Sequence, residues 1–432
     1  MKKEESDISK LLKKMEKVKM STQKPPKGLK SNIELGRDLD LYIISEIVGG
    51  GLPLLTPRGT VIKREIERFV VDEEIKRGYQ HTSTPVMASS DLYKISGHWD
   101  HYQDGMFVLD VHGKKFALRP MTCPFQFVLY KSKPRSYREL PIKYAEMASL
   151  FRNEKSGELR GLTRVRQMTL ADAHIICAPE QIEEEFVEVL NQLRYVMKTL
   201  GIEKDIWYRF SKWDPKNKEK YIQNPGAWEK SQSMMKKILD KQKVKYIEAE
   251  NEAAFYGPKL DLQYKDVFGK EDTLLTIQID FALPERYDMA YRDKDNKDKR
   301  PMVIHRSFTG TTERMMAFLL EKYQGVLPTW ISPTQVRILS FTDKNINYSK
   351  KIIKKLEEEI PNLRIDADFR NTTMQAKVKD AELLKIPYII VLGDREEKEN
   401  NLAIREKGSK KIQTLKVDSF VKSLKKEISE KI

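Results

Sequence analysis

The sequence contains few residues suited to covalent cross-links or to membrane insertion. Only two of its 432 residues are cysteines, Cys123 and Cys177. Two cysteines cannot build a disulfide framework, which favours a reducing compartment. No apolar run approaches the roughly 20 residues that a membrane-spanning helix needs, and the lysine-rich start does not resemble a signal peptide. We therefore expect a soluble, cytoplasmic protein without a membrane partner.

Acidic residues are outnumbered by basic ones. The chain has 79 lysines and arginines against 64 aspartates and glutamates, a formal net charge of +15. Such an excess favours a polyanionic partner, most simply nucleic acid, because binding releases counterions. The alternative is a thermophile-like surface rich in lysine, glutamate and isoleucine, on which the basic excess is incidental.

Three segments of the chain differ in pattern. Residues 1–30 place apolar residues at helical spacing among lysines before the linker STQKPPKG, which predicts a basic helix on a tether. Residues 31–330 mix helices with short strands and predict an α+β domain built on an antiparallel sheet. Residues 331–432 alternate strands and helices, which predicts an α/β module with a largely parallel sheet.

Two local patterns support the antiparallel sheet. GMFVLDV and KKFALRP flank a His112–Gly113 turn, which predicts a β-hairpin. The segment TLLTIQIDFAL alternates apolar residues with Thr276, Gln278 and Asp280. Successive side chains of a strand point to opposite faces, so one face of this sheet is expected to be polar.

Three stretches that lie far apart each combine arginine with a soft metal ligand. One cysteine and two neutral histidines suit a zinc site with an open fourth position, and arginines suit bidentate phosphate recognition. We therefore hypothesise one pocket for phosphates and a metal-chelating small molecule. The stretches contribute Arg119 with Cys123, Arg152 and Arg164 with His174, and His305 with Arg314.

Each metal candidate also has a plainer interpretation. Cys123 precedes Pro124 at a predicted helix start, where the helix dipole favours the thiolate, but a lone cysteine is more often buried and inert. Asp172 and His174 share one face of a predicted strand, while Cys177 points towards the core. The spacing of the three ligands is not a local zinc signature, so the residues alone leave both readings open.

The charged candidates are similarly open. Arg152 in the hairpin FRNE could neutralise an α-phosphate and Glu154 could contact an adenine amino group, although surface hairpins commonly carry such charge pairs. Glu313 and Arg314 lie in the first turn of a predicted helix, from which the arginine could reach a terminal phosphate. An ordinary ion pair at a helix start is the alternative.

Several motifs together resemble the threonyl-tRNA synthetase family of class II aminoacyl-tRNA synthetases over residues 31–432. They are ASSDLYKISGHW, RPMTCP, ADAHIIC, AAFYGPKLDL, IQIDF and VIHRSFTGTTER. Class II motif 1 resembles Gly78–Pro85 with a helix before it, motif 2 resembles FRNE through RVR, and motif 3 resembles Gly310 with Glu313–Arg314.

The resemblance implies a role for each candidate. It implies that one zinc ion is bound, that magnesium accompanies ATP, and that threonine completes the zinc sphere. The implied zinc ligands are Cys123, His174 and His305; the threonine pocket is Asp172, Tyr256 and Gln278; the ATP site is Arg152, Glu154, Arg164, Glu313 and Arg314, with Arg152 and Arg314 catalytic. Gln167 and Leu170–Ala171 depart from the family pattern RVRGFTQDDAH.

The resemblance also covers the C-terminal module, which matches the anticodon-binding domain of class IIa synthetases. Asn371, Glu396 and Arg405 occupy positions that meet anticodon bases in the family. The implied activity is threonine–tRNA ligation: threonine and ATP give threonyl-adenylate, and the threonyl group passes to the 3′-end of tRNA(Thr). A homodimer is expected. The alternative is a non-catalytic paralogue that binds RNA or senses threonine.

One departure concerns editing of serine-charged tRNA. Family members commonly carry a large N-terminal region with an editing site, whereas about thirty residues precede the predicted catalytic domain here and no histidine occurs before His81. We therefore expect no editing in cis, and correction of serine mischarging would require a separate protein acting in trans.

Overall fold

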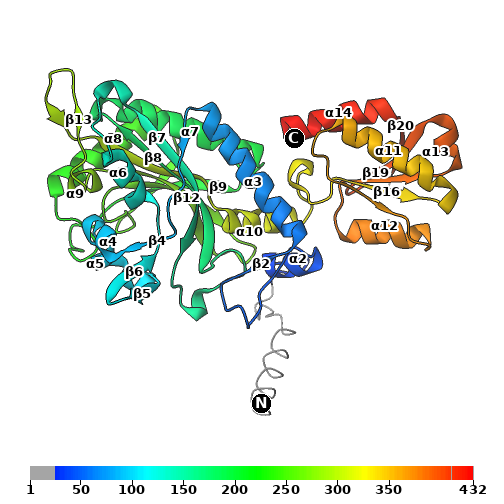
Figure 1. Cartoon of the computed structure of the whole chain (residues 1–432), viewed down its shortest axis with the longest axis horizontal. Helices are drawn as coiled ribbons and strands as arrows, with labels where there is room; N and C mark the ends of the chain where they lie inside the picture. The colour runs from blue at the N-terminus through cyan, green and yellow to red at the C-terminus, as the bar shows by residue number, and fades with distance from the viewer. Residues whose placement is uncertain (1–24, 410, 432) are drawn as a thin grey trace, which may run out of the picture. The chain divides into compact units, whose positions relative to one another are not determined.

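The computed structural model describes residues 25–409 and 411–431, and these form two compact units (Figure 1). One unit comprises Gly50–Leu52 and Glu67–Met315. The other comprises Pro53–Ile66 with the described parts of Met1–Gly49 and Met316–Ile432. The basic helix expected in residues 1–20 lies outside the described residues. Domain boundaries near residues 30 and 330 stay predictions.

An eight-stranded sheet forms the centre of the first unit. The five pairings from β9 to β7 are antiparallel, and only the two edge strands run parallel to their neighbours, which confirms the predicted antiparallel sheet. In spatial order the strands are β10 (Tyr246–Ala249), β9 (Ile206–Ser211), β11 (Lys259–Lys265), β12 (Glu271–Asp280), β15 (Met302–Thr311), β8 (Gln167–Cys177), β7 (Ile142–Phe151) and β3 (Gln80–His81).

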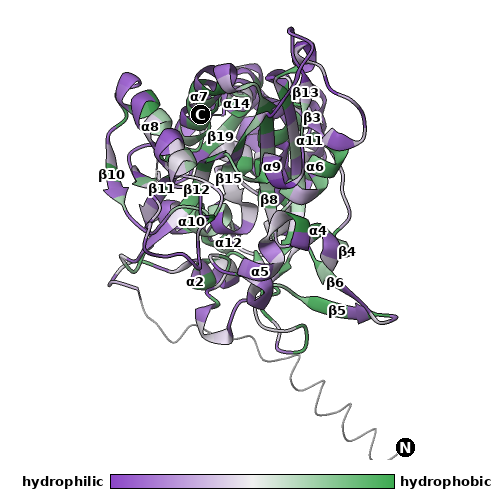
Figure 2. Ribbon diagram, turned by 90° about the vertical axis from the view of Figure 1, so that its left-hand side faces the viewer, coloured by the Kyte–Doolittle hydropathy of each residue, from purple (hydrophilic) through white to green (hydrophobic). Residues whose placement is uncertain are grey.

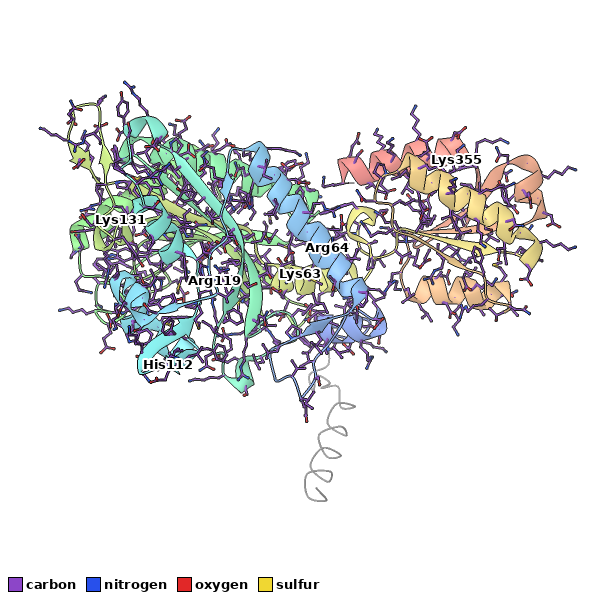
Figure 3. The ribbon with its side chains drawn as sticks, in the orientation of Figure 1. Lys63, Arg64, His112, Arg119, Lys131 and Lys355 are labelled. Atoms are coloured by element: carbon purple, nitrogen blue, oxygen red, sulfur yellow. The ribbon has the colours of Figure 1, made fainter. Side chains whose placement is uncertain are left out.

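Helices and smaller sheets surround this sheet. The predicted hairpin joins β5 (Val108–Val111) to β6 (Lys114–Leu118), and both turn residues have positive φ, 52° at His112 and 77° at Gly113 (Figure 3). The remaining elements are α3 (Pro57–Lys76), β4 (Met87–Ser89), α4 (Ser90–Ser96), α5 (His98–Tyr102), α6 (Cys123–Lys131), α7 (Ile182–Thr199), α8 (Pro225–Lys241), α9 (Leu283–Arg286), β13 (Tyr291–Arg292), β14 (Asp298–Lys299) and α10 (Thr312–Tyr323).

Helix α7 shows why these helices pack on the sheet. Its apolar residues recur three or four positions apart, so they form one stripe that is buried. In its first turn Glu183 and Glu184 are exposed, whereas Glu185 is buried and forms an ion pair with Lys143 at 2.7 Å. Figure 2 shows the same separation, with hydrophobic residues along the strands and hydrophilic ones at the β13 hairpin. None of the helices in the described ranges is both long and apolar enough to cross a bilayer.

The second unit contains a five-stranded sheet in the order β17 (Ile365–Asp368), β16 (Val336–Ser340), β18 (Tyr388–Leu392), β19 (Asn401–Glu406) and β20 (Ile412–Lys416). The first three strands are parallel, but β19 and β20 are antiparallel, so the expected largely parallel sheet is mixed. A short connection after β18 returns the chain as a hairpin instead of a crossover. The unit also holds α2 (Asn32–Asp38), β1 (Tyr42–Ile43), β2 (Leu54–Leu55), α11 (Ile346–Glu359), α12 (Met374–Leu383), α13 (Asp394–Glu399) and α14 (Val417–Glu430).

Alternating residues of β16 bury both faces of this sheet. Val336 and Ile338 belong to a core with residues of α11 and α14, while Leu339 belongs to a second core with Ala381 of α12. Helices on both faces of a central parallel strand are the arrangement expected for an α/β module.

A bulge near the end of β15 redirects the chain into α10. Pairing with β8 shifts register between Ser307 and Thr311. Within it, Gly310 has φ 62°, and a Cβ there would lie 2.1 Å from the carbonyl oxygen of Leu274. Only glycine fits this position, and the bend turns the first residues of α10 towards the sheet face.

Behind that sheet face lies a buried ion pair. Arg306 is 2% exposed, and its Nη1 donates to Oε1 of Glu74 at 2.5 Å. The guanidinium also lies 4.2 Å from the ring centre of Tyr79 and 3.7 Å from that of Phe308. Removing one partner would leave a charge buried without its counter-charge.

We expect Glu74→Ala to lower the free energy of unfolding by about 3–5 kcal/mol, because the charge on Arg306 would remain buried and unpaired. Urea denaturation followed by circular dichroism would measure the change. Glu229→Ala, which removes an exposed carboxylate from α8, serves as the control and should change stability by less than about 0.5 kcal/mol. Equal effects of the two substitutions would contradict the assignment.

Candidate active site

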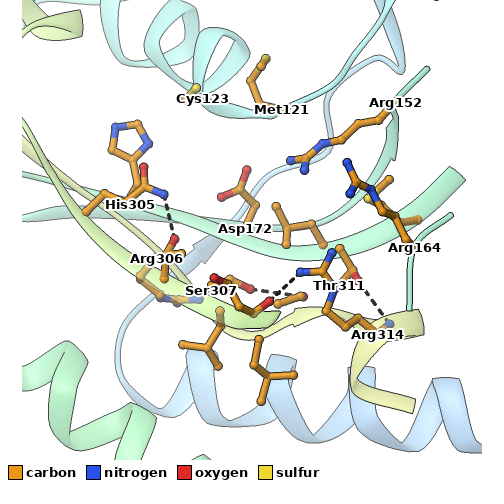
Figure 4. A pocket seen from close by; sticks show the side chains of 18 of the residues that line it. Met121, Cys123, Arg152, Arg164, Asp172, His305, Arg306, Ser307, Thr311 and Arg314 are labelled. Atoms are coloured by element: carbon orange, nitrogen blue, oxygen red, sulfur yellow. Dashed lines mark hydrogen bonds between the residues drawn. The ribbon is translucent and has the colours of Figure 1, made fainter. Parts of the chain in front are cut away.

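A cavity of about 270 Å³ opens on the polar face of the eight-stranded sheet. Its walls come from β8, β12 and β15, the start of α6, the loop after β7 and the start of α10. Figure 4 shows Cys123 and His305 at one end, Arg152, Arg164 and Arg314 at the other, and Asp172 between them. The cavity therefore has a soft-ligand end and a cationic end.

The soft-ligand end brings together the three residues predicted to bind metal. Candidate ligand atoms of Cys123, His174 and His305 all lie within 4.8 Å of one another, and all three residues are buried. His174 and His305 are direct partners across β8 and β15, with ring centres 4.5 Å apart. Cys123 is the first residue of α6. One thiol and two imidazoles are a donor set that suits zinc.

Both imidazoles are held by a second residue. Nδ1 of His174 lies 2.6 Å from Oε1 of Gln126, and Nε2 of His305 lies 2.9 Å from Oδ2 of Asp280. Each ring thus uses one nitrogen for a partner and keeps the other for a ligand, as metal-binding histidines do. Sequence reasoning missed both partners as site residues. Gln126 lies one turn after Cys123, and Asp280 shares the polar strand face with Gln278, which were the available signals.

Burial controls the protonation of the ligands. Desolvation lowers the pKa of His174 well below its ordinary value, which keeps the imidazole neutral and able to bind a metal. Desolvation also raises the pKa of the Cys123 thiol well above its ordinary value. Burial therefore opposes the thiolate that the helix start favours, in agreement with the alternative of a buried cysteine. A bound cation would favour the thiolate.

The three predicted threonine-pocket residues lie beside this cluster. Asp172 is 8% exposed, and burial raises the pKa of its carboxyl. The Tyr256 hydroxyl donates to Oε1 of Gln278 at 2.5 Å, and the Tyr256 ring stacks on that of His305 with centres 4.9 Å apart. All three residues line the cavity, together with Thr276.

At the cationic end, Arg314 is fixed by backbone carbonyls. Its Nε donates to the carbonyl oxygen of Thr163 at 3.1 Å and its Nη1 to that of Thr273 at 2.6 Å. Arg152 also lines the cavity, and its buried Nε has no hydrogen-bond partner among the described residues. An anionic group in the cavity would supply acceptors to both guanidinium groups.

The other predicted ATP-site residues occupy two different places. Glu154 and Arg164 line the cavity and pair with each other, with Nε to Oε2 at 2.9 Å. Glu313 is 5% exposed and faces away from the lining, where its Oε2 accepts from the backbone N–H of Thr169 at 2.8 Å. It therefore ties the start of α10 to β8.

Arg119 does not belong to the cavity, contrary to its grouping with the other arginines. It is 2% exposed, and its Nη1 donates to Oε1 of Glu146 at 2.9 Å. Its Nε donates to the carbonyl oxygen of Ser149 at 2.8 Å. Figure 3 marks this position within the first unit. A guanidinium used this way stabilises the sheet instead of contacting phosphate.

The predicted anticodon residues belong to three different parts of the second unit: a loop, a helix and a strand. Asn371 is exposed after β17, and Glu396 lies in α13 beyond the carboxyl end of β18. Arg405 pairs with Ile389 near the start of β18 and forms an ion pair with Glu382 at 2.5 Å. The end of β18 is about 10 Å further along the strand. A ligand that contacts all three must span the sheet, as several successive bases could.

Two family models match this chain. Residues 107–323 match the tRNA synthetase class II core domain (G, H, P, S and T), and residues 335–427 match an anticodon binding domain. The threonine–tRNA ligase of Clostridium botulinum is 54% identical over 401 residues, which cover 92% of this chain and 62% of the relative.

Solved structures give the same result. The RNA binding domain of threonyl-tRNA synthetase from Cryptosporidium parvum is 33% identical, with a TM-score of 0.86, and the match covers 91% of this chain and 98% of that one. The putative threonyl-tRNA synthetase ThrRS-1 of Aeropyrum pernix is 25% identical, with a TM-score of 0.79 over 93% and 97% of the two chains. The chain therefore belongs to the class II tRNA synthetases, and among them to the threonyl-tRNA synthetase family. It spans 62% of the length of its C. botulinum relative.

We expect Cys123→Ser to abolish stable zinc binding, because a neutral serine hydroxyl is a poor ligand for zinc. Metal analysis after dialysis against a chelator should find about one zinc ion per chain in the parent protein and nearly none in the variant. The matched control is Cys177→Ser, which alters the other buried cysteine on the opposite strand face. Loss of zinc in both variants, or in neither, would contradict the site.

Proposed function

We propose that the chain activates L-threonine with ATP and transfers the threonyl group to the 3′-end of tRNA(Thr). The observation that carries this proposal is one cavity in which a Cys/His/His cluster within 4.8 Å adjoins two arginines held for an anion. An enzyme that joins a chelating amino acid to a nucleotide phosphate needs both ends in one space. The alternative, a non-catalytic paralogue, would have no use for Arg152 and Arg314 at that cavity.

The donor set supports zinc as the resident metal. Three buried, uncharged donors around one point would be poorly satisfied by each other and well satisfied by a soft or borderline cation. A bound zinc ion would supply coordination positions for the amino and hydroxyl groups of threonine. Cys123, His174 and His305 would hold it, while Gln126 and Asp280 keep the imidazoles oriented.

Neighbouring side chains would recognise the rest of the amino acid. Asp172 lies between the two ends of the cavity and would accept a hydrogen bond from the threonine hydroxyl (Figure 4). Tyr256 and Gln278 form a hydrogen-bonded wall beside it. A carboxylate that stays unpaired when the ligand lacks a hydroxyl penalises apolar analogues.

The cationic end would bind ATP. Arg152 would contact the α-phosphate and Arg314 the terminal phosphates, so that charge developing in the transfer meets fixed donors. Glu154, with Arg164 beside it, would contact the adenine amino group. Magnesium accompanying ATP would neutralise further charge on the phosphates.

The carboxylate of threonine would attack the α-phosphate with loss of pyrophosphate. A hydroxyl of the terminal ribose of tRNA would then attack the carbonyl carbon of the mixed anhydride, with release of AMP.

We expect the chain to discriminate against valine much more strongly than against serine when each amino acid replaces threonine in ATP–pyrophosphate exchange. Valine lacks the hydroxyl and should react at least about 10⁴-fold less efficiently in kcat/KM, while serine lacks only a methyl and should lose about 10- to 200-fold. The exchange assay with each purified amino acid would measure both ratios. Asp172→Asn should reduce the preference for threonine over valine, as a ratio of kcat/KM values, more than the preference for threonine over serine. Equal discrimination against serine and valine would contradict the proposed pocket.

The C-terminal module would bind the anticodon of tRNA(Thr). The net charge of +15 suits a polyanionic partner. Among the three predicted contacts, Arg405 has the most hydrogen-bond donors, because Asn371 has an amide and Glu396 a carboxylate. Its pairing with Glu382 at 2.5 Å holds the guanidinium in place before RNA binds.

We expect Arg405→Ala to lower the kcat/KM for tRNA in aminoacylation about 10- to 100-fold. One base-contacting arginine contributes about 1–3 kcal/mol to the free energy of RNA binding. ATP–pyrophosphate exchange, which needs no tRNA, should be unchanged. Lys425→Ala on the exposed side of α14 is the control and should leave both rates unaltered. Equal loss of both activities in Arg405→Ala would refute the assignment.

Other properties rest on the family resemblance. They are a homodimer, a cytoplasmic location and, if serine is mischarged, a separate protein that edits in trans. Threonine-dependent exchange by the purified chain tests the proposed function as a whole. Absence of exchange in zinc-loaded protein that still binds tRNA would favour the non-catalytic alternative.

A further inference from the structure

The side chain of Gln126 occupies an unusual position for an amide. It is 0% exposed, and it lies within α6 one turn after Cys123, so its helix presents both residues to the same region. Its Oε1 lies 2.6 Å from Nδ1 of His174, and its Nε2 donates to Oγ1 of Thr82 at 2.9 Å. Both ends of the amide are therefore engaged.

The hydrogen bonds beyond Thr82 fix which way this amide faces. Oγ1 of Thr82 donates to Oε2 of Glu146 at 3.1 Å. Glu146 is ion-paired with Arg119, whose Nη1 donates to Oε1 of Glu146 at 2.9 Å. The carbonyl oxygen of Ala145 is a second acceptor, 3.4 Å from Oγ1 of Thr82. With acceptors on this side, Thr82 gives its single hydrogen to one of them and accepts from the amide nitrogen of Gln126.

The orientation of the amide then determines the tautomer of His174. With its nitrogen used on Thr82, Gln126 presents an acceptor oxygen to the imidazole, so Nδ1 must carry the hydrogen. Nε2 is left without a hydrogen, and it lies 3.8 Å from Oδ1 of Asp172, a residue that lines the cavity. A metal ligand needs this unprotonated nitrogen.

We infer that Gln126 is a positioning residue that presets Nε2 of His174 as the metal-binding nitrogen, through a hydrogen-bonded chain that begins at Arg119. This inference rests on the proposed zinc site and adds a residue outside its ligand set. It also gives Arg119 and Glu146 a role in that site, at a distance from the cavity.

The two histidines differ in this respect. His305 is oriented by Asp280, whose Oδ1 also accepts from the backbone N–H groups of Ala282 and Leu283 at 2.8 and 2.9 Å. His174 is oriented by a neutral amide. A second carboxylate at position 126 would add another negative charge beside Asp172, which burial already disfavours as an anion. A glutamine supplies the acceptor without that charge.

Zinc affinity of the purified full chain tests the inference directly. Gln126→Met keeps the volume and removes the acceptor, and we expect its dissociation constant for zinc to rise about 10- to 100-fold in competition with a chromogenic chelator. Gln126→Glu keeps an acceptor oxygen for Nδ1 but loses the donor to Thr82 and adds a charge, so its affinity should lie between those of Gln126→Met and the parent. Thermal unfolding of the metal-free proteins shows whether the fold itself has changed.

The matched control is Gln192→Met, which removes a buried glutamine of α7 that donates and accepts hydrogen bonds away from the cavity. It should lower stability without changing zinc affinity. Parent-like zinc affinity in Gln126→Met would overturn the inference while leaving the zinc site intact. An equal loss of affinity in Gln126→Glu would also overturn it. If the parent chain itself binds no zinc, the proposed metal and this inference both fail.

Discussion

The pairing of β8 with β15 is the constraint on which the rest of the site depends. Its register sets His174 opposite His305 and Ser307 opposite Asp172. A slip of one residue would move each side chain to the other face of the sheet. The bulge that follows, with Gly310 against the carbonyl of Leu274, ends this register and starts the helix that carries Arg314. One strand pair thus fixes the distance between the two histidines and the cationic end.

The uncharged soft-ligand residues and the arginines occupy opposite ends of one cavity. At the soft-ligand end, burial holds the histidine and the thiol in uncharged forms, so the free protein does not store uncompensated charge there. At the other end, backbone carbonyls accept from the guanidinium of Arg314, and Glu154 accepts from Arg164. Asp172 lies between the two, in reach of a ligand that bridges them.

Sequence reasoning predicted the fold class and the hairpin at His112, because alternation and turn residues are local signals. The gathering of Cys123, His174 and His305 was hypothesised from residue types and implied by the family resemblance, since their spacing carries no local signature. It missed what depends on tertiary contacts. Arg119 looked like a phosphate ligand until its partner Glu146 was known. The helix start at Cys123 favoured the thiolate, whereas the burial that raises the pKa of this thiol depends on tertiary packing. The antiparallel direction of β19 and β20 was also not predicted. Strand direction depends on the length of the connection and on strand pairing, and the periodicity of the sequence does not reveal either.

The central claim is that Cys123, His174 and His305 form one metal site at the soft-ligand end of the cavity, where threonine would bind. X-ray absorption at the zinc edge of the loaded chain, with and without threonine, tests it most directly. We predict one sulfur at about 2.3 Å and two imidazole nitrogens at about 2.0 Å, with added light-atom ligands when threonine is present. A sphere with no sulfur, or one that threonine leaves unchanged, would contradict the account.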